Sequence, residues 1–303
     1  MPSLDKAQGK HVSVLLHESI DSLNLEEGDT FLDGTLGSGG HSAYVLERFG
    51  NKVHLIGLDR DPKALKRSEE KLRILSSHVR LVQESFRHLD RALALLEVKS
   101  VDAILFDLGI SSDQLGDPDY GMSFQEDAPL SMSMSPDSEL SAKLIVNTWD
   151  EETLELIFRG FGEEKFSRRI AREIVERRES KPFETTFDLV DAVRAATPAA
   201  SHRGKLHPAT RTFQALRIAV NEELTSLEDG LEKGFAALAP NGRFAVISFH
   251  SLEDRIVKQF FKQKAESNEA HLITKRPIVP TDAEVVSNPR SRSAKLRVLE
   301  KNQ

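Results

Sequence analysis

A short segment, residues 30–41, places the strongest constraint on the fold. An apolar run ends at Asp33 and is followed at once by a cluster of four glycines. This pattern predicts a strand, a tight loop, and a helix whose positive N-terminal end faces a ligand. Dinucleotide-binding loops use the spacing G-x-G-x-x-G, whereas Gly34, Gly37 and Gly39 follow G-x-x-G-x-G. The acid beside the loop favours a cationic or hydroxyl-rich ligand over a diphosphate.

Apolar segments alternate with amphipathic stretches through the first third of the chain, which is typical of a parallel sheet covered by helices. The predicted strands are Thr30–Asp33, Val53–Asp59, Val79–Gln83 and Val101–Asp107. Three of them end in a carboxylate. Because ligands bind at the carboxyl ends of the strands in doubly wound sheets, Asp33, Asp59 and Asp107 are expected to line one edge.

The strand pattern stops after Ser112, and the residues that follow predict an inserted domain. Residues 113–140 are rich in Gly, Asp, Ser, Pro and Met and predict an ordered loop, with helical patterns up to about residue 209. A continuous helix from Phe213 to Leu238, ended by Pro240-Asn241-Gly242, then predicts the return of the main fold.

The chain is expected to close with strands over Arg243–Phe249 and Ala294–Leu299. The predicted fold class is α/β, a mostly parallel sheet with an inserted helical domain. The predicted domains are 1–115, 116–209 and 210–303, in which the first and third form the sheet domain and the second lies on the substrate side.

Composition excludes several classes of protein. No apolar run approaches the roughly 18 to 20 residues needed to cross a bilayer, and the polar N-terminus does not resemble a signal peptide, so a cytoplasmic location without membrane association is expected. The net charge of −7 argues against indiscriminate binding to nucleic acid. Residues 1–150 carry −10 and residues 151–303 carry +3, so if a polyanion binds, it is expected to bind the second half. The absence of cysteine and of any HExxH motif predicts no metal site.

Asp59 is a candidate for binding the hydroxyls of an adenosyl ribose, because an ionised carboxylate can accept two hydrogen bonds at once. Its alternative role is a helix N-cap, for which Asp61, directly before Pro62, is better placed. Phe86, which follows the third strand, is either a cover for the adenine face or a core residue.

The glycine loop could instead be a tight turn that binds no ligand. The two further acids at strand ends disfavour this purely structural interpretation. Asp33 is either a cofactor contact or a brace for the loop. His41 is either a cofactor contact or a helix-start residue bonded to the backbone. The sequence leaves both of these pairs open.

Two residues could take up a proton in catalysis. Asp107 ends the fourth strand, and a strand-end carboxylate can accept an N–H proton as an amine attacks a methyl donor, although holding the cofactor is the alternative. His250 follows a strand predicted to lie beside the fourth, where a structural role is favoured over a catalytic one.

The segment Asn288–Arg297 carries four cations, Arg290, Arg292, Lys295 and Arg297, between small or apolar residues. Such a pattern can follow a phosphate backbone, and it is equally typical of an edge strand protected by charge.

Long motifs resemble the bacterial ribosomal RNA small-subunit methyltransferase H family. In the first half these are Asp-Gly-Thr-Leu-Gly-Ser-Gly-Gly-His at 33–41, Leu-Asp-Arg-Asp-Pro at 58–62 and Asp-Leu-Gly-Ile-Ser-Ser at 107–112. In the second half they are the segments 207–218, 246–255 and 288–293. The resemblance extends from about His11 to Lys301.

The resemblance implies a class I, Rossmann-like methyltransferase that uses S-adenosyl-L-methionine to methylate N4 of a decoding-centre cytidine in 16S rRNA. It implies the following cofactor contacts: Gly39, Gly40, His41, Asp59, Phe86, Asp107 and Gln114, beside which Asp33 and Gly37 are candidates. Arg211 and Arg217 in the 207–218 motif join the four cations of the tail as RNA-binding candidates. The expected partner is the small ribosomal subunit or its late precursor, with the protein a monomer or a homodimer.

The chain departs from the family between residues 120 and 134. Relatives typically carry Arg-Gly-Phe-Ser-Phe and Asp-Gly-Pro-Leu-Asp-Met-Arg-Met, whereas this chain has Tyr-Gly-Met-Ser-Phe at 120–124 and Asp-Ala-Pro-Leu-Ser-Met-Ser-Met at 127–134. A flipped cytosine would suit a mobile aromatic and Met-rich loop here. The absence of cysteine favours N4 over C5, because C5 methylation normally needs a thiolate nucleophile. Alternatives are a non-catalytic, cofactor-binding ribosome assembly factor and, disfavoured by the glycine spacing, a nicotinamide oxidoreductase.

Overall fold

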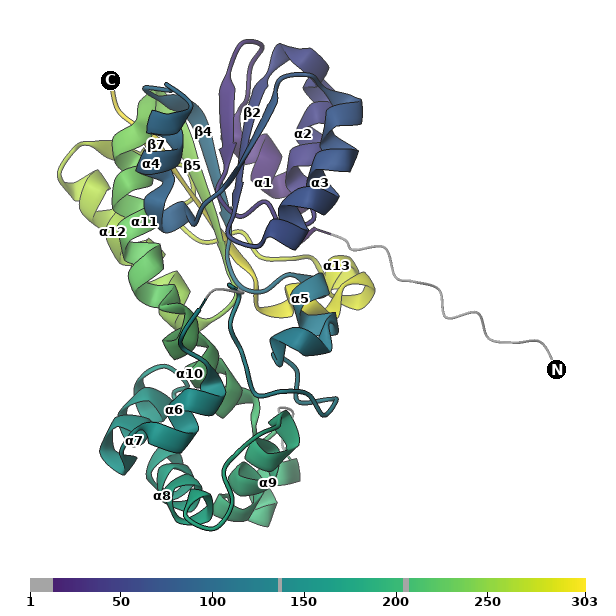
Figure 1. The fold of residues 1–303 in the computed structure, drawn as a ribbon. Coiled ribbons are helices and arrows are strands. Elements are labelled where there is room, and N and C mark those ends of the chain that lie inside the picture. Colours follow the sequence, from purple (N-terminus) through teal and green to yellow (C-terminus); the bar gives the residue numbers. More distant parts are fainter. Residues whose placement is uncertain (1–12, 136–137, 204–206) are drawn as a thin grey trace. The chain divides into compact units, whose positions relative to one another are not determined.

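The structure, a computed structural model, describes residues 13–135, 138–203 and 207–303 (Figure 1). Two predictions fall outside these residues. They are the absence of a signal peptide at the N-terminus and the start of the family resemblance at His11. Contacts divide the chain into two compact units. The sheet unit comprises Met1–Gly109 and Leu227–Gln303, and the helical unit comprises Ile110–Ser226.

The sheet unit is built on one seven-stranded sheet in the order β3-β2-β1-β4-β5-β7-β6. Strands β1 to β5 run parallel to one another, and β7 runs antiparallel to both β5 and β6. The strands are β1 (Thr30–Asp33), β2 (His54–Asp59), β3 (Val79–Gln83), β4 (Val101–Asp107), β5 (Leu238–Ser248), β6 (Ala270–Leu272) and β7 (Lys295–Lys301). This mostly parallel, Rossmann-like sheet confirms the predicted fold class. The three-residue β6 was missed because it is too short to show a pattern.

Helices cover both faces of this sheet (Figure 1). Successive residues along β1 and β4 alternate between two cores, with Phe31 and Leu105 in the first and Leu32 and Ile104 in the second. The first core contains α1 to α3 and the second contains α4, α11 and α12. Burial on both faces explains why these strands are continuous apolar runs. The helices are α1 (Leu16–Leu23), α2 (Gly40–Phe49), α3 (Pro62–Leu75), α4 (Leu89–Leu95), α11 (Glu223–Ala237), α12 (Ser251–Glu266) and α13 (Asp282–Ser287), with 3-10 turns η1 (Gly50–Lys52), η2 (Phe86–His88) and η5 (Pro289–Ser293).

The helical unit packs around its own apolar core, in which Ile145, Phe158, Ile170, Val193 and Leu216 are buried. Its helices are α5 (Ser112–Gly116), α6 (Ala142–Thr148), α7 (Glu151–Gly160), α8 (Ser167–Arg178), α9 (Thr186–Ala196) and α10 (Thr210–Asn221), with η3 (Pro118–Tyr120) and η4 (Ala199–Arg203). Among the described residues of the whole chain, no helix is both long and apolar enough to span a bilayer.

The prediction of one continuous helix from Phe213 to Leu238 is wrong. Glu222 takes a left-handed backbone conformation with φ of 48°, which ends α10 before α11 begins. Phe213 and Leu216 of α10 are buried in the helical core, whereas Leu227 and Leu231 of α11 are buried in the second core of the sheet unit. The apolar stripe therefore serves two cores, and the helical unit ends at Ser226 instead of residue 209.

Pro240-Asn241-Gly242 does not end a helix either. These residues lie within β5, at a register shift where Val101 pairs with Leu238 and Ala103 already pairs with Arg243. Asn241 has a φ of 63°, and a Cβ on Gly242 would lie 2.8 Å from the Asp102 carbonyl oxygen. The turn residues form a bulge in the strand.

Candidate functional site

Strand-end residues of the sheet unit form the candidate site. The glycine loop after β1 is fixed at both sides by backbone hydrogen bonds. The N–H of Gly34 donates to the Leu105 carbonyl of β4 at 2.9 Å, and the N–H of Leu36 donates to the Leu58 carbonyl of β2 at 2.9 Å. Thr35 Oγ1 accepts from the Asp107 N–H at 2.6 Å. The loop is therefore held at the carboxyl ends of three adjacent strands, as the sequence predicted.

The glycines are required for different reasons. Gly37 and Gly39 have φ of 51° and 69°, a region that favours glycine. A Cβ on Gly34 would collide with the Phe106 ring, and one on Gly40 would collide with Ser13 Oγ. The N–H groups of Gly34, Gly37 and Gly39 all donate within the protein. Packing and backbone conformation thus account for much of the glycine cluster, and the space beside Gly37 stays open.

Asp33 and Asp59 brace this loop. Asp33 is buried, and its oxygens accept from the Ser42 hydroxyl at 2.6 Å and the Thr35 N–H at 3.2 Å. Asp59 accepts from the N–H groups of Gly37 at 2.8 Å and Asp61 at 2.9 Å. Each oxygen retains a second lone pair, so Asp59 keeps the capacity to accept ligand hydroxyls.

Asp61, not Asp59, is the N-cap of α3, with its side chain accepting from the Lys63 N–H at 2.8 Å. The choice between the two acids made from the sequence is confirmed for the cap. The adenosyl role of Asp59 stays a prediction.

Asp107 differs from these acids because its Oδ1 is buried without a hydrogen-bond partner among the described residues. Its Oδ2 lies 3.7 Å from His41 Nδ1, while His41 Nε2 lies 3.1 Å from the Val14 carbonyl oxygen. His41 is thus a helix-start residue bonded to the backbone, one of its two expected roles. A buried acceptor without a partner costs free energy, so its presence at a strand end indicates a role other than stability.

Burial raises the pKa values of all three acids. The pKa of Asp33 rises to about 6, partly offset by its bonds to Ser42 and Thr35. Burial likewise raises the pKa of Asp59. The pKa of Asp107 rises well above its usual value, first through burial and then through repulsion from Asp33 and Glu253. A cationic ligand would relieve this crowding of buried carboxyls.

Phe86 packs against Phe106, with ring centroids 4.7 Å apart, and lies at the edge of the second core. The ring is only partly buried, so both expected roles remain compatible with its position. Gln114 belongs to the helical unit, where it is buried and its Oε1 accepts from the Ser111 N–H at 3.1 Å.

His250 caps α12. Its Nδ1 accepts from the Glu253 N–H at 3.4 Å, and the Glu253 carboxylate accepts in return from the His250 N–H at 3.2 Å. Its Nε2 lies 3.2 Å from Glu253 Oε1 but outside hydrogen-bond geometry. This is the structural role that the sequence favoured. Glu253, which is 3% exposed, was missed, although its position three residues after the cap is the signal of a capping box.

The RNA-binding candidates fall into two groups. Arg217 forms a bidentate pair with Glu223 at 2.8 and 3.0 Å, and Arg211 donates to the Glu163 carbonyl at 3.2 Å. Lys295 and Arg297 share Asp254, at 2.9 and 2.8 Å. Among the described residues, only the exposed Arg290 and Arg292 of this set make no ion pair or side-chain hydrogen bond.

The loop that departs from the family is packed into the helical unit. Met122, Met132 and Met134 are at most 7% exposed, and Phe124 stacks on His207 with centroids 4.6 Å apart. Met132 belongs to the helical core and all three methionines are buried, so residues 120–134 do not present the exposed Met-rich surface expected for a flipped base. The order predicted for 113–140 stays a prediction, since 136–137 lie outside the described residues.

A family model described as the MraW methylase family matches residues 8–302. The chain belongs to the MraW methylase family. The family resemblance read from the motifs is thereby confirmed, and the chain is a methyltransferase. A protein named ribosomal RNA small subunit methyltransferase H, from Heliobacterium modesticaldum, is 46% identical over 96% of this chain and 98% of its own length.

Solved structures similar to this MraW methylase family member include a putative rRNA-methylase from Clostridium thermocellum. It is 15% identical, with 96% of this chain and 98% of that chain covered and a TM-score of 0.47. An rRNA methylase from Streptococcus thermophilus is 13% identical, with 96% and 99% covered and a TM-score of 0.46.

Proposed function

We propose that this protein transfers a methyl group from S-adenosyl-L-methionine to N4 of a decoding-centre cytidine in 16S rRNA. The observation that carries the proposal is the unpartnered, buried Oδ1 of Asp107 at the end of β4, in a chain 46% identical to a protein named as a small-subunit rRNA methyltransferase. The absence of cysteine supports amine methylation over C5 methylation.

The residues of the sheet unit fit the cofactor. Asp59 would hold the ribose hydroxyls, Phe86 would cover the adenine, and the open space beside Gly37 lets the loop approach the ligand. The crowded carboxyls around Asp107 favour a positive charge nearby. When bound, S-adenosyl-L-methionine supplies an electrophilic methyl group attached to a sulfonium.

Asp107 would accept the proton that the amine loses as its nitrogen bonds to the methyl group. Thr35 holds the Asp107 backbone N–H, which fixes the strand end from which the carboxylate projects. Most of the acceleration would come from positioning the amine, with proton acceptance adding to it. Hydrogen bonding to Glu253 makes His250 a residue that fixes the start of α12.

The test is to incubate the protein with S-adenosyl-L-methionine carrying a labelled methyl group, together with small ribosomal subunits or 16S rRNA that lack the modification. We expect one cytidine to carry the label on N4, identified by nuclease digestion and mass spectrometry. Label on C5, or no transfer to any ribosomal substrate, would refute the proposal. Tight cofactor binding without transfer would identify a non-catalytic assembly factor instead.

A further inference from the structure

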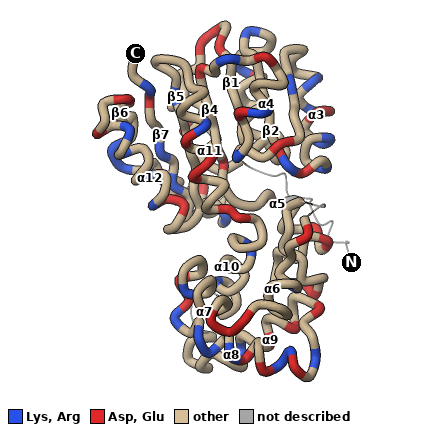
Figure 2. The backbone as a smooth tube through the Cα atoms, turned by 60° about the vertical axis from the view of Figure 1, so that its left-hand side comes forward, with Lys and Arg blue, Asp and Glu red and all other residues tan. Residues whose placement is uncertain are grey.

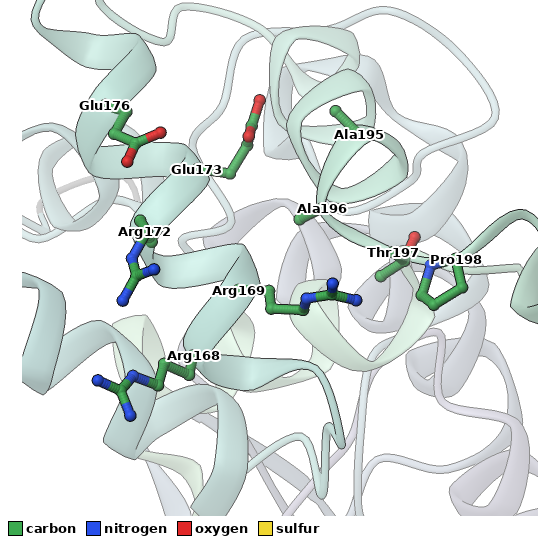
Figure 3. Close-up of a pocket in the computed structure, with 9 residues that line it drawn as sticks. All are labelled: Arg168, Arg169, Arg172, Glu173, Glu176, Ala195, Ala196, Thr197 and Pro198. Carbon is green, nitrogen blue, oxygen red and sulfur yellow. The ribbon is translucent and has the colours of Figure 1, made fainter.

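A pocket in the helical unit gathers three arginines that the proposed chemistry does not use. Arg168, Arg169 and Arg172 come from the first half of α8 and line the pocket together with Thr197 and Pro198, which follow α9 (Figure 3). All of these residues belong to one compact unit. Figure 3 shows Arg169 pointing toward Thr197 and Pro198, while Arg168 and Arg172 point to the other side of α8.

These arginines are poorly neutralised within the protein. Arg168 and Arg169 are exposed and make no ion pair or hydrogen bond among the described residues. Arg172 Nε lies 3.6 Å from Glu151 Oε1, in a pair whose two side chains are 54% and 39% exposed. Glu173 could neutralise Arg169 one turn away, but it pairs with Arg177 at 2.5 Å. Glu176 also lines the pocket, four residues after Arg172, so the three arginines face one further acid. Positive charge therefore stays in excess at this pocket.

These three arginines of α8 form a positively charged cluster on a unit whose net charge is negative. Residues 110–226 hold 14 Lys and Arg against 21 Asp and Glu. Figure 2 shows Lys and Arg positions along α8, close to red acidic segments of the same unit. Solubility alone would not require adjacent unpaired arginines on such a unit, because the acids already supply its net charge.

At the start of α8 the Glu164 carboxylate accepts from the Phe166 N–H at 2.8 Å, so an acid partly offsets the positive end of the helix. The positive potential of the pocket therefore comes from the arginine side chains. Guanidinium groups bind phosphate oxygens in a bidentate manner. Because the three side chains point in two directions, they suit separate phosphates along a polymer better than one small anion.

We propose that this α8 pocket binds backbone phosphates of the RNA substrate and so anchors the helical unit on it. The inference rests on the proposed function for the identity of the RNA. The pocket would supply affinity without reading the sequence, since phosphate contacts position a nucleic acid and carry no base information.

The test compares Arg168→Gln/Arg169→Gln/Arg172→Gln with the wild type in methyl transfer to small subunits and in binding to the naked 16S rRNA segment. We expect KM for subunits and Kd for RNA to rise about tenfold or more, with kcat and cofactor binding unchanged. The log Kd against log salt slope should become shallower by about two to three, since three phosphate contacts are lost and each removes about 0.7 to 0.9. A matched control, Arg159→Gln/Lys143→Gln/Lys181→Gln, removes three exposed cations elsewhere in the unit and should leave Kd and the slope near wild type.

An unchanged KM and salt slope in the triple variant would refute phosphate binding at the pocket while leaving the methylation proposal intact. Loss of binding to subunits with normal binding to naked RNA would also overturn it, by showing that the arginines contact a ribosomal protein. Wild-type protein that transfers no methyl group would refute the proposed function, yet a salt-dependent RNA affinity lost in the triple variant would still support the pocket. A second variant with Lys at all three positions keeps the charge and should recover part of the affinity, which separates charge from any effect on folding.

Discussion

Three strand-end acids of similar sequence context have different surroundings. Asp33 and Asp59 accept hydrogen bonds from the glycine loop, whereas Asp107 has a buried oxygen with no partner among the described residues. Replacing a loop-bracing acid should lower stability, whereas the unpartnered Oδ1 of Asp107 can be removed without breaking a hydrogen bond among the described residues. The three side chains should therefore respond differently to substitution.

Asp59→Ala should weaken binding of S-adenosyl-L-methionine by roughly 1.5–3 kcal/mol, the range for hydrogen bonds to a charged group. Isothermal titration calorimetry would measure this. The matched variant Asp61→Ala removes the α3 cap and should lower the free energy of unfolding by about 1 kcal/mol while leaving the cofactor Kd close to wild type. Equal effects of both variants on Kd would show that Asp59 acts only by holding the loop.

The rate of methyl transfer should rise with pH through the raised pKa of Asp107. Only the ionised carboxylate can accept a proton, and burial together with repulsion from Asp33 and Glu253 keeps it protonated at the acid end of the range. Asp107→Asn should slow the single-turnover rate by about 10²-fold and remove this pH dependence. A variant that keeps the wild-type pH profile would exclude Asp107 as the proton acceptor.

At the scale of elements, a loop and a helix of the helical unit depend on one amide. The Asn221 side chain, 6% exposed at the end of α10, accepts from the Met134 N–H at 2.9 Å and donates to the Met132 carbonyl at 2.8 Å. Asn221, which was not among the predicted site residues, therefore holds part of the segment 120–134, where the chain departs from its relatives.

Asn221→Ala should lower the free energy of unfolding by about 1–3 kcal/mol, because it removes two buried hydrogen bonds from the Asn221 amide to the backbone of the loop. Urea unfolding would measure this, and limited proteolysis should show faster cleavage near residues 120–134. Asn147→Ala is a useful control, since Asn147 bonds Phe183 in the same way elsewhere in the unit and should destabilise without exposing the loop. An unchanged proteolytic pattern in Asn221→Ala would mean that methionine burial alone holds the loop.

At the scale of the whole molecule, the folded units redistribute the charge. Residues 1–150 and 151–303 have net charges of −10 and +3. Divided by folded unit, residues 110–226 have a net charge of −7, and the remaining residues have a net charge of zero. The excess of cations in the second half therefore does not mark one basic domain. It is spread over both units, where many of the cations form ion pairs.

The helical unit should fold by itself, because it is one continuous segment with its own apolar core. A protein comprising residues 110–226 is expected to show helical circular dichroism and a single cooperative thermal transition. The sheet unit requires both Met1–Gly109 and Leu227–Gln303, so residues 1–109 alone should not unfold cooperatively. A non-cooperative transition for residues 110–226 would show that the helical core depends on the rest of the chain.

The sequence by itself determined where the buried strands of the first third lie and which of them end in a carboxylate. Buried strands leave continuous apolar runs, and their ends at Asp33, Asp59 and Asp107 mark the ligand edge, because period and composition are local properties of the chain. The family followed from long motifs for the same reason. The Asp61 cap could also be read directly, since a cap is decided within one helical turn.

Only the tertiary structure decided which core each part of the 213–238 stripe joins and which polar groups find partners. Phe213 and Leu227 look alike in sequence, yet they are buried in different units. Arg217 and Arg297 are neutralised by acids that the fold brings to them, while Arg168 and Arg169 are not. Pairing depends on distances between segments, which no local pattern encodes, so the orphaned oxygen of Asp107 and the arginines of α8 appear only once the chain is folded.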